Sequence, residues 1–205
     1  MQAARTKRLR GLDWTNQILR GMSSTGAYDP RSIANLLLEI ADQQQRPLTN
    51  LELQKLLYFA HAIFLIETGD PLILGCFEAW QYGPVHPIVY KAFQESRDKP
   101  IRSRASRVDV LTGMKSPLPP PASPPIRELC LRIMAQYGRM TAGRLVDISH
   151  AKNAPWHYIV NKAKTSLALG LRIPDNVIVE RFRYHKVSVG AKPTYGEPSE
   201  DTPLA

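Results

Sequence analysis

The chain has 205 residues, 43% of them hydrophobic, which is enough for one domain with a sizeable core and tails. Its formal net charge of +9 permits contact with nucleic acid or with an acidic protein and does not choose between them. The longest apolar run is interrupted by His61 and is too short for a bilayer, which needs about 20 residues. Cys76 and Cys130 match no metal-ligand spacing, and the basic N-terminus lacks the apolar stretch of a signal peptide. We therefore expect a cytoplasmic protein with free thiols.

Residues 1–27 are expected to form a basic extension, with a short helix from Asp13 to Arg20. Met22 is followed by Ser-Ser-Thr-Gly and offers a second translation start. Two alternatives remain open for this extension: a docking segment, or sequence upstream of the true start.

Two long helices are predicted next. Asp29-Pro30 is a helix-start signal, and apolar residues at helical spacing then continue to about Gln44. Thr49 and Glu52 form a capping box that opens a second helix, which Gly69 ends.

A short aromatic strand follows over residues 77–82, and Gly83-Pro84 is predicted to end it as a turn. Pro87 then begins a short helix through Ser96.

The second half is predicted to be helical after a long irregular insertion at residues 98–124, whose proline-rich end favours polyproline II. Further helices are expected to start at Ser123 or Pro125, at Thr141, at Pro155 and at Pro174-Asp175. Residues 187–205 are polar and proline-rich and are expected to form a disordered tail.

The residues that carry enzyme chemistry do not form a recognisable set. His150 and His157 are seven residues apart, but Pro155 between them breaks a shared helix, so no metal site is expected. Neither cysteine lies in a glycine-framed turn, and no phosphate-binding glycine loop is present in the sequence. From these residues we expect no catalysis.

The aromatic residues allow two interpretations. Tyr58 and His61 share one side of a helix, and Trp80 and Tyr82 share one face of a strand. Partly exposed, they suit a protein interface, where Trp and Tyr dominate the binding energy. Buried, they are core aromatics whose polar tips bond to the backbone.

Nucleic-acid binding is the alternative that the charge suggests, because residues 97–107 carry five basic side chains and Asp98 as the only acidic one. The sequence shows no helix-turn-helix pair, no zinc finger and no aromatic sheet motif.

Three motifs occur in order along the chain: Leu53-x-Lys55-Leu56-Leu57-Tyr58-x-Ala60, then Glu78-Ala79-Trp80-x-Tyr82-Gly83-Pro84-Val85-x-Pro87, then Ser149-His150-x-x-x-x-Pro155-Trp156. On these motifs the chain resembles the Panacea domain, the SocA-like antitoxin family of phage-associated GepA-like proteins. The resemblance covers residues 28–186, and the Glu-Ala-Trp-x-Tyr-Gly-Pro-Val block is its most specific part.

The resemblance implies a mainly α, compact multi-helix single domain with a small β element around residues 76–83. It also implies an antitoxin that binds a cognate protein toxin, commonly encoded beside it, with no catalysis and no cofactor. The residues themselves add the expectation of no metal and no membrane contact. A DNA-binding regulator of its operon or of phage genes is the alternative, as is an adaptor that delivers a partner to a protease. The candidate partner-binding residues are Tyr58, His61, Trp80, Tyr82, Gly83, Pro84 and His150.

Overall fold

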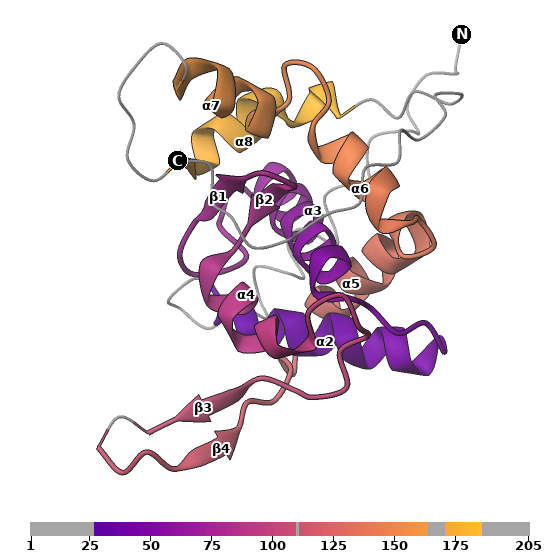
Figure 1. Ribbon diagram of the computed structural model, residues 1–205, viewed down its shortest axis with the longest axis vertical. Helices are drawn as coiled ribbons and strands as arrows, with labels where there is room; N and C mark the ends of the chain where they lie inside the picture. Colours follow the sequence, from indigo (N-terminus) through magenta and orange to yellow (C-terminus); the bar gives the residue numbers. More distant parts are fainter. Residues whose placement is uncertain (1–26, 110, 164–170, 186–205) are drawn as a thin grey trace, which may run out of the picture.

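A computed structural model describes residues 27–109, 111–163 and 171–185. Helices dominate this part of the chain and surround a central helix, α3 (Asn50–Thr68), as Figure 1 shows. The prediction of a mainly α domain with a small β element is confirmed. The helix expected at Asp13 to Arg20 and most of both terminal segments lie outside the described residues. The domain limits at residues 28 and 186 stay a prediction.

Helix α3 begins and ends where local chemistry predicts. The Thr49 hydroxyl accepts a hydrogen bond from the Glu52 N–H at 3.3 Å, and the Glu52 carboxylate accepts one from the Thr49 N–H at 2.9 Å. Gly69 ends the helix at a φ of 82°, which a residue with a side chain rarely adopts. Helices pack on several sides of α3, so that the polar residues Gln54, Lys55 and His61 are buried together with its apolar ones.

The helices around α3 start at the predicted signals. Asp29 caps α2 (Pro30–Gln43) by accepting from the Arg31 N–H at 2.9 Å. Thr141 caps α6 (Ala142–Ser149) in the same way, through the Arg144 N–H. The other helices are α4 (Pro87–Phe93), α5 (Pro124–Tyr137), α7 (Pro155–Ala163) and α8 (Asp175–Arg181), with 3₁₀ turns η1 (Gln94–Ser96) and η2 (Phe182–Tyr184). Among the described residues, every helix is too short or too polar to cross a membrane.

A small antiparallel sheet lies against this helical body. Strand β1 (Phe77–Trp80) is central and pairs with β2 (Gly83–Val85) and β5 (Arg172–Ile173). The prediction that Gly83-Pro84 forms the turn is wrong: both residues belong to β2, with Trp80 opposite Gly83. The turn lies two residues earlier, at Gln81 and Tyr82. Pro84 is tolerated in the strand because β2 is at the edge of the sheet.

The insertion at residues 98–124, predicted to be irregular, contains a β-hairpin. Strand β3 (Ser106–Val108) pairs with β4 (Lys115–Pro117), and the two strands project away from the helices (Figure 1). Its side chains are largely exposed, so no alternation of apolar and polar residues reveals these strands in the sequence.

Candidate functional site

The turn between β1 and β2 borders a recess in the surface. Much of its wall is formed by Trp80 at the end of β1, by Gln81 and Tyr82 in the turn, and by Tyr90 of α4. The Trp80 and Tyr90 ring centroids are 4.8 Å apart. Gln81 is exposed, whereas the three aromatic side chains are half-buried. The complete lining is Leu51, Gln54, Trp80, Gln81, Tyr82, Val85 and Tyr90. These side chains carry no carboxylate, imidazole, thiol or amine, so the recess offers an apolar surface and hydrogen bonds.

Two indole hydrogen bonds hold the recess in place. The Trp80 Nε1–H donates to the Glu78 carboxylate at 2.9 Å within β1. The Trp156 Nε1–H donates to the Trp80 carbonyl at 2.7 Å and so joins α7 to the end of β1. The His150 ring stacks on Trp156 with 3.7 Å between centroids and 13° between planes. His150 and Trp156, from the Ser-His and Pro-Trp motifs, therefore support the end of β1, where the turn begins.

A tightly packed junction beneath β2 explains the glycine in this motif. Gly83 has a φ of 98°, and a Cβ atom there would overlap the Ser149 hydroxyl and lie 3.0 Å from the Lys55 Cε. The Lys55 ammonium, fully buried, donates to the Pro84 carbonyl at 3.0 Å. Only a residue without a side chain allows α3, β2 and α6 to meet this closely.

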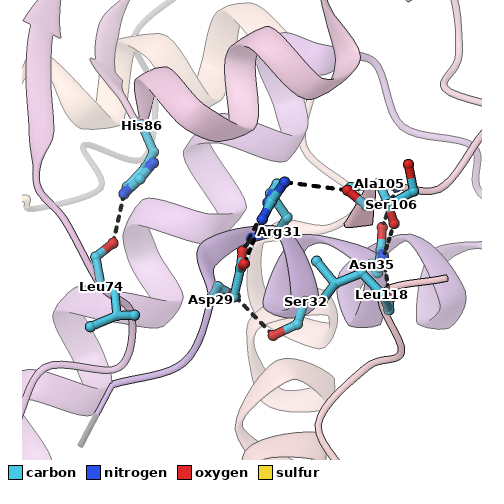
Figure 2. A network of polar contacts seen from close by, with 9 residues as sticks. All are labelled: Asp29, Arg31, Ser32, Asn35, Leu74, His86, Ala105, Ser106 and Leu118. Atoms are coloured by element: carbon cyan, nitrogen blue, oxygen red, sulfur yellow. Dashed lines mark hydrogen bonds and ion pairs between the residues drawn. The ribbon is translucent and has the colours of Figure 1, made fainter. Parts of the chain in front are cut away.

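The other end of β2 is also tied to α3. The His86 N–H donates to the Gln54 side-chain carbonyl at 2.8 Å, so the side chain of this buried polar residue of α3 bonds to the chain just after β2. The His86 Nε2 lies 3.0 Å from the Leu74 carbonyl. Figure 2 shows this contact. Burial lowers the pKa of His86 below its ordinary value, so the imidazole stays neutral. A neutral ring donates from Nε2 to the Leu74 carbonyl and fixes the loop before β1.

Tyr58 and His61 lie inside the molecule. Tyr58 is 0% exposed, and its ring contacts Phe77 edge-on at 5.3 Å between centroids. Burial raises the pKa of its hydroxyl, which has no hydrogen-bond partner within the described residues. His61 is 1% exposed and places Nε2 3.1 Å from an Asp175 carboxylate oxygen. This placement favours the interpretation of Tyr58 as a core aromatic.

The remaining predicted residues divide by position. Trp80 and Tyr82 meet at the recess, while Gly83 and Pro84 are buried beneath it. Burial also lowers the pKa of His150, to about 3, with smaller contributions from Lys55 and His157. Partner contact by any of these residues stays a prediction.

Sequence reasoning missed five residues that line the recess: Leu51, Gln54, Gln81, Val85 and Tyr90. Gln54 offered a signal, because it is a polar residue within an apolar helical run. Tyr90 offered none, since tertiary packing alone brings α4 to the turn.

The described residues contain no group of three His, Cys, Asp or Glu side chains that could hold a metal ion. Cys130 is buried in the core, which raises the pKa of its thiol to about 12 and leaves it unreactive. The geometry is that of a helical domain with an aromatic recess in its surface.

Comparison with known proteins gives this domain its family. The family described as "Antitoxin SocA-like, Panacea domain" matches residues 53–157, which run from α3 into α7 and include every residue that lines the recess except Leu51. The chain is also 48% identical over 177 residues to "Antitoxin SocA" of Caulobacter vibrioides strain NA1000 / CB15N, covering 86% of this chain and 94% of that protein. The chain therefore belongs to the SocA-like Panacea-domain family, and the resemblance in its motifs is confirmed. No solved structure matches it significantly.

Proposed function

We propose that this protein is an antitoxin that binds a cognate protein toxin, encoded by the adjacent gene, and neutralises it by direct contact. The observation that carries the proposal is the 48% identity to a protein named as an antitoxin, of which this chain covers 94%. Identity at this level over nearly the whole length supports a shared role.

The recess is the surface that we assign to this contact. Trp80, Tyr82 and Tyr90 are half-buried, so their rings are held in place and need little further ordering when a partner binds. Rigid aromatic side chains around an apolar depression are typical of interface hot spots. In this proposal an apolar side chain of the toxin packs against these rings, and binding there occludes the toxin's active site or substrate surface.

The protein acts by stoichiometric binding and not by catalysis in this proposal. The lining of the recess lacks the side chains that serve as nucleophile or general base in most enzymes.

A growth assay tests the function and the surface together. The open reading frame beside this gene is induced alone and with this protein, and we expect growth arrest alone and rescue together. Gln81→Arg places a charged side chain at the exposed rim of the recess and is expected to weaken rescue. Gln44→Arg, at an exposed position that ends α2, is the matched control and should rescue normally. Failure of the wild-type protein to rescue would contradict the proposed function, and full rescue by Gln81→Arg would contradict the surface.

A second candidate function, a DNA-binding regulator, is favoured by one observation. The five basic side chains of residues 97–107 are all exposed, which suits contact with phosphates. If they bind DNA, the logarithm of the binding constant falls linearly with the logarithm of the salt concentration, with a slope of about −0.9 for each phosphate contact. A titration of the promoter fragment of its operon at several salt concentrations measures that slope.

A further inference from the structure

The β3–β4 hairpin exposes apolar side chains that the fold does not use. Leu111 is 96% exposed, Met114 70% and Val108 48%, and all three lie at or beside the tip of the hairpin. Within the described residues, β3 and β4 pair only with each other. A two-stranded hairpin is at best marginally stable in water, and exposed Leu and Met at its tip add nothing to that stability. An exposed apolar tip of this kind is a candidate interaction site.

The root of the hairpin, in contrast, is firmly held. Asn35 of α2 is 2% exposed, and its side-chain amide donates to the Ala105 carbonyl at 3.0 Å and to the Leu118 carbonyl at 2.7 Å. Its side-chain carbonyl accepts from the Ala105 N–H at 2.9 Å. Figure 2 shows this clamp, in which one side chain of the helix holds the chain on both sides of the hairpin.

A second clamp lies beside the first. The Arg31 guanidinium pairs with Asp29 at 2.7 Å and also donates to the Ser106 carbonyl at 3.3 Å (Figure 2). The pKa of the Asp29 carboxyl is lowered, chiefly by this hydrogen bond with Arg31, so the pair is charged at neutral pH. Both clamps act at the root, so α2 presents the hairpin as an arm of defined direction with an apolar tip.

The charges on the arm indicate the chemistry of its partner. Arg107 and Lys115 are exposed on the two strands, and Arg102 is exposed before them. Asp109 is the acidic residue at the tip, and its carboxylate accepts hydrogen bonds from the N–H groups of Leu111 and Thr112. The flank of the arm is therefore basic, while its tip is apolar and carries one carboxylate.

These features favour a protein over nucleic acid. The Asp109 carboxylate is ionised next to the apolar side chains and would repel phosphates if the tip entered a groove of DNA. Methionine and leucine side chains suit an apolar depression on a protein, where their burial supplies free energy. Basic side chains behind the tip complement acidic ones around such a depression.

We propose that the β3–β4 hairpin is a second contact arm for the toxin, which inserts Leu111 and Met114 into an apolar depression bordered by acidic side chains. This inference rests on the proposed antitoxin function and adds a surface separate from the recess. Burial of the apolar tip holds the complex together, and Arg107 and Lys115 speed its formation.

The test uses the full-length protein and the purified product of the adjacent reading frame. Leu111→Ser combined with Met114→Ser removes the apolar tip without touching the core, and we expect binding at least tenfold weaker, which is about 1.4 kcal/mol. Leu74→Ser is the matched control, because Leu74 is 57% exposed on the body of the protein. A separate variant, Arg107→Glu with Lys115→Glu, is expected to slow association at low salt and to differ less at high salt.

The outcomes separate this inference from the function on which it rests. If the wild-type protein neither binds nor neutralises the product of the adjacent reading frame, the proposed function fails and the arm with it. If the wild-type protein binds and the Leu111/Met114 variant binds within about twofold of it, the arm is not a contact site. Loss of binding to a promoter DNA fragment, with toxin binding retained, would assign the arm to nucleic acid and overturn the proposal.

Discussion

Gly83→Ala tests whether the junction beneath β2 is packed as tightly as the structure shows. Two separate costs are expected. A residue with a side chain is strained at a φ of 98°, by about 1–2 kcal/mol. The new methyl group must also displace the Ser149 hydroxyl and the Lys55 side chain, and overpacking of this kind costs about 1–3 kcal/mol.

Gly69→Ala is the matched control that separates the two costs. Gly69 has a φ of 82°, close to that of Gly83, but no atom lies within 4 Å of a Cβ placed there. The free energy of unfolding of Gly69→Ala should fall only by the strain, about 1–2 kcal/mol, whereas that of Gly83→Ala should fall by about 2–5 kcal/mol in total. Urea denaturation followed by far-ultraviolet circular dichroism gives both free energies of unfolding. Equal losses in the two variants would refute the close approach of Ser149 and Lys55 to β2.

Three further variants test other parts of the structure. Asn35→Ala should lower the free energy of unfolding by about 3 kcal/mol or more in urea denaturation, because buried backbone groups at the root of the hairpin lose their partners. The control Gln43→Ala, on the exposed side of α2, should lower it by less than about 0.5 kcal/mol. A similarly small loss for Asn35→Ala would contradict the clamp. Trp156→Phe replaces the indole by a smaller ring that has no N–H donor, so it removes the hydrogen bond to the Trp80 carbonyl together with some ring contacts. It should cost at least about 1 kcal/mol in the same assay, and an unchanged midpoint would contradict that bond. The pKa of His150 is lowered from its ordinary 6.5 to about 3, so its contribution to stability is complete above pH 6.5 and falls on acidification, because the unfolded chain takes up the proton first. Between pH 7 and pH 5.5 this histidine should account for about 1.3 kcal/mol of lost stability, which His150→Phe should abolish; the same pH dependence in that variant would show that His150 is not responsible.

Local signals in the sequence were sufficient for the helices. The Asp29-Pro30 pair, the Thr49 and Glu52 capping box and the stop at Gly69 each depend on residues within one turn, and the structure confirms all three. Strand β5 could not be predicted, because it has two residues and pairs with β1 nearly a hundred positions away. The β3–β4 hairpin escaped prediction for a different reason, since its exposed strands leave no periodic pattern.

The site was predictable only in part. Trp80 and Tyr82 lie in a dense motif that is recognisable without the fold, and the structure does bring them together. Tyr58 shows what the sequence alone leaves open: it allows a partly exposed or a buried side chain, and helices that pack on several sides of α3 bury this residue completely. Leu51 and Tyr90 reach the recess through tertiary packing, which no local pattern encodes.

The most direct test of the central claim is an equilibrium titration of the purified product of the adjacent reading frame with this protein, at about 0.3 M salt to screen nonspecific charge attraction. The account predicts a stoichiometric complex at this salt concentration, weakened at least tenfold by Gln81→Arg at the recess and unaffected by Gln44→Arg. Absence of a complex, or equal affinity for the wild-type protein and Gln81→Arg, would contradict neutralisation through this surface.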